Sequence, residues 1–138
     1  MGRVNAPVVR LPVGVDLVRV SRIAESLERF GTRFLRRIFT ADEIAYSMAA
    51  PALAPERLAA RFAAKEAALK ALGLVEHPRD WRDIEVCRRT SGACELALHG
   101  ALREAATRAG ADSFALSLSH EGDYATAVVI TSVHETRS

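Results

Sequence analysis

Two acidic side chains of this 138-residue chain lie in stretches that are otherwise largely apolar. Asp16 belongs to the short run 13–17, and Glu66 belongs to the alanine-rich run 57–72. Converging carboxylate oxygens, completed by waters and substrate phosphates, are the ligands that Mg²⁺ prefers. The two residues therefore predict a magnesium and phosphate site. An ordinary helix ion pair between Glu66 and Lys70, four residues apart, also fits the spacing.

The run 57–72 also carries a lysine where a buried helix would carry leucine. On a helical projection Lys65 falls close to the stripe formed by Leu58, Phe62 and Leu69. Unpaired buried charge is very costly, so a lysine at this position needs an anion. Lys65 is therefore a candidate ligand-binding residue.

His120 and Glu121 form another candidate group, in a turn expected over residues 120–123. A histidine there can bind a phosphate and a carboxylate can accept a proton, although a solvated turn would also explain both. The sequence contains no glycine-rich phosphate loop, no His/Cys metal quartet and no nucleophile elbow. Spacing alone therefore leads no further than a magnesium and phosphate site.

The helix expected over residues 55–72 must hold Glu66 in place. Pro55 suits a first helical turn, and Gly73 is a natural stop. The surface of this helix is apolar nearly all round, which predicts burial. Its many alanines allow neighbouring backbones to come close.

The first third of the chain predicts a strand over residues 13–17 and a helix over residues 19–30. Apolar residues continue at helical spacing beyond Gly31, where a break or kink is expected. If the helical register survives Gly31, four arginines form a row on one face: Arg22, Arg29, Arg33 and Arg36. Such a row would face either an acidic partner or the solvent.

The rest of the chain predicts two helices and two hairpins. Thr40 and Glu43 form a capping-box pattern, which starts a helix over residues 40–49. Beyond a loop over residues 75–83 we expect a hairpin of 84–89 with 94–99, a helix over 101–109, and a hairpin of 114–119 with 124–131.

Helices in the first half and hairpins in the second indicate an α+β fold, with helices packed on a small antiparallel sheet. The exposed edges of such a sheet favour oligomerisation. We expect an irregular leader over residues 1–12, a single domain over residues 13–132 and a frayed tail over residues 133–138.

Composition narrows the class of protein. The net charge of +2, from 19 basic and 17 acidic residues, gives no overall signal for nucleic-acid binding. Neither a membrane-spanning run nor a secretory signal is apparent, so we expect a cytoplasmic protein. Reduced thiols are expected for Cys87 and Cys94, although a cross-strand disulfide is conceivable.

Three segments, taken in order, resemble the holo-acyl-carrier-protein synthases, the short one-domain class of 4′-phosphopantetheinyl transferases. They are Val-Gly-Val-Asp-Leu (13–17) followed by Ser-Arg-Ile (21–23), Arg-Phe-Ala-Ala-Lys-Glu-Ala-Ala-Leu-Lys-Ala (61–71), and Ser-Leu-Ser-His-Glu (117–121) with Tyr-Ala-Thr-Ala-Val-Val-Ile (124–130). The similarity runs from about residue 13 to residue 130. The chain departs from the pattern of many family members in two places. Residues 73–78 stand in place of a Gly-Thr-Gly-type loop, and Ser-Gly-Ala (91–93) stands in place of Gly-Lys-Pro.

The resemblance implies the 4′-phosphopantetheinyl transferase fold, as a homotrimer with active sites between subunits. It implies that the phosphopantetheine arm of coenzyme A is transferred, with Mg²⁺, to a serine of an apo acyl carrier protein, releasing adenosine 3′,5′-bisphosphate. By matched position it assigns Asp16 and Glu66 to the metal, Lys65 and Lys70 to the diphosphate and reaction centre, Arg61 and His120 to the coenzyme A phosphates, and Arg22 to the carrier. Arg29 and Arg33, in the same basic row, are further expected carrier contacts.

The residue that takes the serine proton is left open by the sequence. Glu66, a metal-held water and Glu121 are all candidates, and we favour Glu66 or a water that it polarises. A carrier-protein-binding module that kept the basic helix but lost turnover is the alternative to an enzyme.

Overall fold

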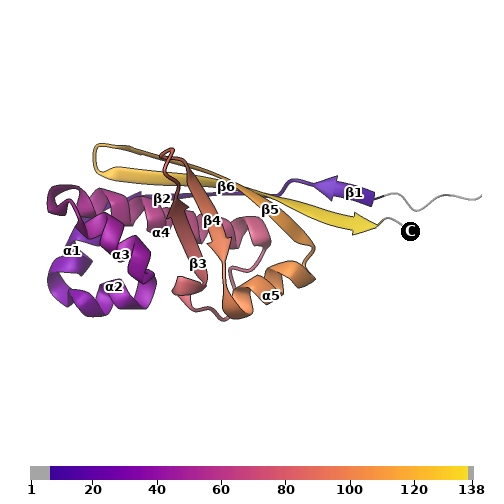
Figure 1. Cartoon of the computed structure of the whole chain (residues 1–138), viewed down its shortest axis with the longest axis horizontal. Helices are drawn as coiled ribbons and strands as arrows, with labels where there is room; N and C mark the ends of the chain where they lie inside the picture. Colours follow the sequence, from indigo (N-terminus) through magenta and orange to yellow (C-terminus); the bar gives the residue numbers. More distant parts are fainter. Residues whose placement is uncertain (1–6, 137–138) are drawn as a thin grey trace, which may run out of the picture.

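The long helix α4 (Ala54–Leu72) lies along one face of a four-stranded antiparallel sheet. The computed structural model describes residues 7–136 of the chain (Figure 1). The strand β6 (Tyr124–Thr136) is central and pairs with the other three: β1 (Pro7–Arg10), β2 (Val13–Arg19) and β5 (Ala111–Glu121).

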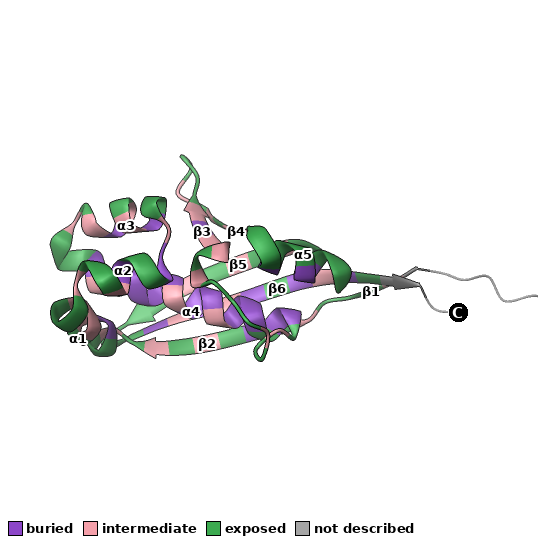
Figure 2. Ribbon diagram, turned by 90° about the horizontal axis from the view of Figure 1, so that it is seen from below, coloured by how far each residue is buried: buried purple, intermediate pink, exposed green. Residues whose placement is uncertain are grey.

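The remaining elements lie on the same side of this sheet as α4 (Figure 2). Three helices follow β2 and gather at one end of the molecule: α1 (Val20–Phe30), α2 (Thr32–Ile38) and α3 (Ala41–Met48) (Figure 1). The other elements are a hairpin of β3 (Ile84–Arg88) and β4 (Cys94–Leu98), the helix α5 (Gly100–Arg108), and two 3₁₀ turns, η1 (Pro51–Leu53) and η2 (Trp81–Asp83).

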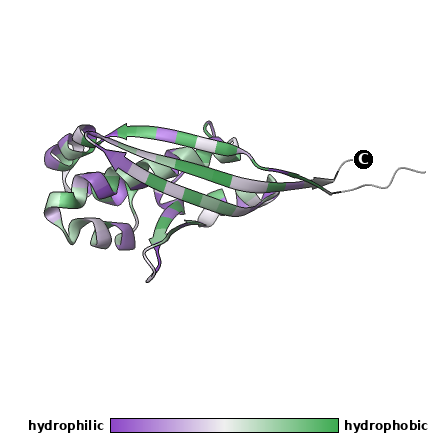
Figure 3. Cartoon of the chain, turned by 90° about the horizontal axis from the view of Figure 1, so that it is seen from above, coloured by the Kyte–Doolittle hydropathy of each residue, from purple (hydrophilic) through white to green (hydrophobic). Residues whose placement is uncertain are grey.

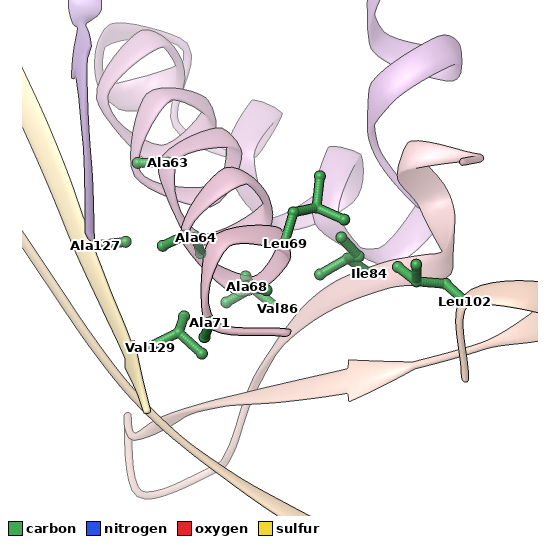
Figure 4. Close-up of a cluster of buried hydrophobic side chains, with 11 residues drawn as sticks. Ala63, Ala64, Ala68, Leu69, Ala71, Ile84, Val86, Leu102, Ala127 and Val129 are labelled. Atoms are coloured by element: carbon green, nitrogen blue, oxygen red, sulfur yellow. The ribbon is translucent and has the colours of Figure 1, made fainter. Parts of the chain in front are cut away.

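The core is built on the alanines of α4. Ala63, Ala64, Ala67 and Ala68 are each fully buried, and α4 is buried along almost its whole length (Figure 2). Alanines of α4 face Ala127 and Val129 of β6, and its Leu69 faces Ile84 (Figure 4). Small side chains on this helix therefore allow the sheet to approach closely.

Gly14 shows how close this approach is. A Cβ atom at Gly14 would lie 2.0 Å from the carbonyl oxygen of Ala67, so only glycine fits between β2 and α4. Because side chains alternate along a strand, Asp16 points to the same face of the sheet as Gly14 and therefore toward α4. The close contact thus sets the height of Asp16 above the helix.

The opposite face of the sheet is open and apolar. Val13, Val15 and Leu17 of β2 are each more than half exposed there. Val13 pairs directly with Ile130, which is 38% exposed, and Val15 pairs with Val128. We call these five residues the open sheet face, and Figure 3 views the sheet from this side. The apolar positions of β2 thus point away from the core.

The structure confirms the α+β fold, the buried helix ended by Gly73, the capping box of Thr40 with Glu43, and both hairpins. Among the helices of residues 7–136, none is long and apolar enough to cross a membrane. Cys87 and Cys94 are free thiols. They face Glu95 and Arg88 across the hairpin, at adjacent positions whose side chains point to opposite faces.

Several boundaries were predicted wrongly. Residues 7–10 of the expected irregular leader form β1, and residues 133–136 of the expected frayed tail extend β6. These two stretches pair with each other across the whole length of the chain, a contact that no local pattern reveals. The other leader and tail residues, 1–6 and 137–138, lie outside the described residues.

Two local predictions also need correction. The helical register does not survive Gly31, which has a positive φ of 53° and separates α1 from α2. The four arginines therefore do not form one continuous helical row.

His120 and Glu121 belong to β5, so the turn of the second hairpin is Gly122 and Asp123.

Candidate active site

Asp16 and Glu66 line one cavity of about 810 Å³ between β2, α1, α2 and α4. Asp16 reaches it because β2 turns this residue toward α4, and the hydroxyl of Thr126 fixes the strand there by donating to the Asp16 carbonyl at 2.8 Å. Glu66 reaches it from the middle of α4 and is half-buried. The structure thus brings together the two carboxylates that the sequence singled out.

Lys70 forms its ion pair with Asp16, whereas helical spacing suggested a pair with Glu66. Lys70 Nζ lies 3.1 Å from Asp16 Oδ1 and also donates to the Val15 carbonyl at 3.0 Å. Glu66 forms no hydrogen bond or ion pair with any residue in 7–136. Lys70 therefore neutralises Asp16 and leaves Glu66 without a partner.

Burial raises the pKa of Glu66, and the nearby charge of Asp16 raises it further. The positive charges of Lys70, Arg79 and Arg22 oppose this shift. A half-buried carboxylate that faces a second carboxylate without a counter-ion is a site that a divalent cation would stabilise. The two residues present therefore fit a metal.

Asp16 and Glu66 by themselves would leave most positions around a metal ion open. Within residues 7–136 there is no group of three or more His, Cys, Asp or Glu side chains that could hold a metal ion. Mg²⁺ is usually held by one or two carboxylates and keeps its other positions for water and substrate phosphates. Asp16 and Glu66 provide this kind of incomplete ligand set.

A second cavity, of about 460 Å³, lies on another side of α4 and is lined by Arg61 and His120. The Arg61 side chain is buried, and its Nε atom has no hydrogen-bond partner. Its Nη1 donates to the Arg57 carbonyl at 3.3 Å, and burial lowers its pKa. His120 Nδ1 lies 3.9 Å from Glu56 Oε2. Among residues 7–136, no carboxylate forms an ion pair with the buried Arg61, as expected of an anion-binding residue.

Tyr46 organises this second cavity, and sequence reasoning missed it. The guanidinium carbons of Arg57 and Arg61 lie 4.3 Å from the centre of its ring, and that of Arg88 lies 5.1 Å away. Arg88 Nη1 donates to the Tyr46 hydroxyl at 2.6 Å, and Arg57 Nη1 donates to the Tyr46 carbonyl at 3.0 Å. The four-residue spacing of Arg57 and Arg61 could have suggested a shared face, but Arg88 arrives only through the β3–β4 hairpin.

Lys65 pairs with Glu43, so the anion expected beside this lysine is a residue of the chain. The Lys65 ammonium is fully buried, 2.7 Å from Glu43 Oε1. It also donates to the carbonyls of Trp81 and Ile84, so its three protons are all used. Glu43 accepts in addition from the backbone N–H groups of Thr40 and Val86. Lys65 thus joins α3, α4 and β3, and its expected contact with the diphosphate stays a prediction.

The remaining predicted residues are exposed. Arg22 lines that cavity on α1. Arg29 lies near the end of α1, where its guanidinium carbon is 5.5 Å from the centre of the Phe30 ring, and Arg33 is on α2. Glu121 ends β5 beside the turn. No residue lines both cavities, so within the chain Arg61 and His120 lie apart from Asp16 and Glu66.

Comparison with known proteins shows what this arrangement resembles. A family model described as the 4′-phosphopantetheinyl transferase superfamily matches residues 12–129. The chain is 47% identical over 121 residues to a holo-[acyl-carrier-protein] synthase of Koribacter versatilis, and the aligned residues cover 87% of this chain and 96% of that relative. It is 45% identical over 118 residues to a protein of the same name from Solibacter usitatus, with 85% and 94% covered.

Solved structures agree with these relatives. The ACPS–CoA complex of Chronobacterium ammoniagenes is 33% identical, with a TM-score of 0.76 over 88% of this chain and 96% of that one. The holo-[acyl-carrier-protein] synthase of Helicobacter pylori in complex with coenzyme A is 28% identical, with a TM-score of 0.75 over 86% and 98%. The chain therefore belongs to the 4′-phosphopantetheinyl transferase superfamily and, within it, to the family of the holo-[acyl-carrier-protein] synthases.

Proposed function

We propose that this protein transfers the 4′-phosphopantetheine arm of coenzyme A to a serine of an apo acyl carrier protein in the cytoplasm, with Mg²⁺. The serine oxygen forms a bond to the phosphorus next to the pantetheine arm, and the bond from that phosphorus to the bridging diphosphate oxygen breaks. Adenosine 3′,5′-bisphosphate leaves. The observation that carries this proposal is Glu66, half-buried, unpaired and facing Asp16 across one cavity.

Asp16 and Glu66 would hold the metal, which when bound supplies charge neutralisation at the diphosphate. Lys70 keeps Asp16 in place and adds a positive charge beside it. Glu66, or a water that it holds, is the proposed acceptor of the serine proton. Glu121 is less suited, since it ends β5 outside the lining of this cavity.

The second cavity is the proposed site of the other coenzyme A phosphates. Arg61 is buried without a carboxylate partner, and His120 lines the same cavity. Arg57 and Arg88 add two further positive charges around Tyr46. A multiply charged phosphate would satisfy the free Nε of Arg61 and the clustered guanidinium groups together.

We propose a homotrimer in which each active site lies between two subunits. The two half-sites of one chain line different cavities, so a rotational arrangement of subunits would let the second cavity of one chain complete the first cavity of its neighbour. The open sheet face supplies an apolar surface for such an assembly. The free thiols Cys87 and Cys94 fit a reducing compartment.

Carrier recognition is the proposed role of Arg22, Arg29 and Arg33. Arg22 lies at the metal cavity itself, whereas Arg29 and Arg33 lie on the helices beyond it. Charges arranged in this way would steer an acidic carrier helix toward the reacting centre. Binding through them should weaken as the salt concentration rises.

The test is a mass measurement on a panel of apo carrier proteins, from both fatty-acid and secondary-metabolite synthesis. With coenzyme A and Mg²⁺, we expect the mass of one phosphopantetheine group to be added to at least one carrier, and a chelator to stop the reaction. A folded protein that transfers nothing to any carrier would contradict the proposal. Salt-sensitive carrier binding without transfer would instead support a binding module that lacks turnover.

A further inference from the structure

The start of α1 is held by a residue from the far end of the chain. Val20 N–H donates to the Asp123 carbonyl at 2.8 Å, and Ser21 N–H donates to Asp123 Oδ1 at 2.8 Å. The Ser21 hydroxyl donates to Asp123 Oδ2 at 2.6 Å. Both carboxylate oxygens of Asp123 and its carbonyl thus bind the first turn of one helix.

α1 has no cap of its own that could replace this contact. Its N-cap residue, Arg19, makes no side-chain capping bond, and its first turn contains no acidic residue. Arg22 in that turn places a positive charge near the positive end of the helix dipole, which is unfavourable. The carboxylate of Asp123 supplies the missing negative charge and an acceptor for the Ser21 N–H, and its backbone carbonyl accepts from the Val20 N–H.

α1 is packed only shallowly. Ile23 is the one fully buried residue among its 11, Val20 and Leu27 are partly buried beside it, and helices of this length are marginal on their own in water. A shallowly packed helix belongs to the part of a structure that opens more easily. Its end cap therefore matters more than that of a deeply packed helix such as α4.

The turn held in this way borders the proposed reaction site. Ser21 and Arg22 both line the cavity that contains Asp16 and Glu66, and so does Tyr124, the neighbour of Asp123. Asp123 itself lies in the turn between β5 and β6, and β5 carries His120 in the second cavity. The hairpin tip thus connects α1 with both half-sites of the chain.

We infer that Asp123 is a positioning residue for carrier binding: through Ser21 it holds the start of α1, and with it Arg22, at the mouth of the Asp16–Glu66 cavity. The inference rests on the proposed function for its kinetic consequence. Asp123 touches neither the diphosphate nor the metal ligands in this scheme. Loss of its contacts lowers the fraction of molecules with Arg22 in place, which weakens carrier binding in proportion.

Kinetics of Asp123→Ala, with a carrier that is active in the mass assay, test the inference. We expect Asp123→Ala to raise KM for the carrier about fivefold, the effect typical of a lost helix cap. KM for coenzyme A and kcat should stay within about twofold of the parent. Asp123→Asn keeps an acceptor for the Ser21 N–H and should restore most of the affinity, because asparagine caps helices about as well as aspartate.

Asp112→Ala is the matched control. Asp112 is an exposed aspartate at the other end of β5, and its carboxylate lies 3.1 Å from His134. The control removes the same charge without touching α1, so KM for the carrier should not change. An unchanged KM in Asp123→Ala, an equal rise in KM for coenzyme A, or an equal effect of Asp112→Ala would overturn the positioning role.

Amide hydrogen exchange tests the contact itself and needs no activity. The amides of Val20 and Ser21 should exchange faster in Asp123→Ala and at the parent rate in Asp112→Ala. Equal protection in all three proteins would overturn the contact. If the parent transfers nothing while the amides respond as expected, the proposed function fails, but the contact of Asp123 with the start of α1 is confirmed.

Discussion

Gly14→Ala links the packing of the fold directly to the reaction. The added Cβ would lie 2.0 Å from the Ala67 carbonyl oxygen and 2.8 Å from the Ala71 amide nitrogen, whereas ordinary contacts of this kind begin at 3.4 Å. Both neighbours are backbone atoms, so β2 and α4 must separate by about 1 Å or more. Overpacking of this kind costs about 1–3 kcal/mol of unfolding free energy, which for a chain of this length lowers Tm by roughly 3–12 °C.

The functional cost should exceed the loss of stability. Asp16 lies two residues after Gly14, and Glu66 lies beside Ala67, so the displacement separates the two carboxylates. A misplacement of about 1 Å at a reacting centre can reduce the rate about a hundredfold. We therefore expect well-folded Gly14→Ala, measured far below its Tm, to transfer phosphopantetheine at no more than about a tenth of the parent rate.

Gly73→Ala is the control for this experiment. Gly73 follows α4 at a φ of 69°, and no atom lies within 4 Å of the position that its Cβ would occupy. The substitution costs about 1 kcal/mol through its backbone conformation but does not push β2 away from α4. If Gly14→Ala keeps the parent activity and Tm, or loses only as much activity as Gly73→Ala, the argument from close packing is wrong.

Three further predictions concern charged side chains. The raised pKa of Glu66 means that the folded state holds its proton more tightly than the unfolded chain, so ionised Glu66 destabilises the metal-free fold. Glu66→Gln should therefore raise the metal-free unfolding free energy more at pH 7 than at pH 4, while lowering transfer at least about tenfold; lower stability at pH 7 would refute this. Arg61→Met should raise KM for coenzyme A about tenfold with little loss of Tm, because Arg61 has no carboxylate partner to leave behind. An equal rise in KM for the carrier would argue against it. Lys65→Met should cost about 3–5 kcal/mol in chemical denaturation, since Glu43 is left buried and unpaired. Adding Glu43→Leu should recover part of this loss, and an additive loss would contradict the pairing.

Local patterns were sufficient for most elements of the fold. The alanine-rich run, Pro55 and Gly73 define α4, and Thr40 with Glu43 defines the start of α3, because propensity and capping act between residues close in sequence. The same patterns could not predict β1 or the end of β6. These strands form through pairing between the two ends of the chain, and the register of such pairing is a property of the folded sheet.

The sequence by itself determined that Asp16, Glu66 and Lys65 have unusual surroundings, because charge in an apolar run is visible in the run itself. Only the tertiary structure decided their partners. Lys70 pairs with Asp16, which leaves Glu66 free, and Lys65 pairs with Glu43. A side chain's partner is set by how strands and helices pack, and here one glycine at residue 14 brings β2 against α4. Arg61 and Glu66 point to different sides of α4 because of the helical period, and the elements packed on each side place the two halves of the proposed site in different cavities.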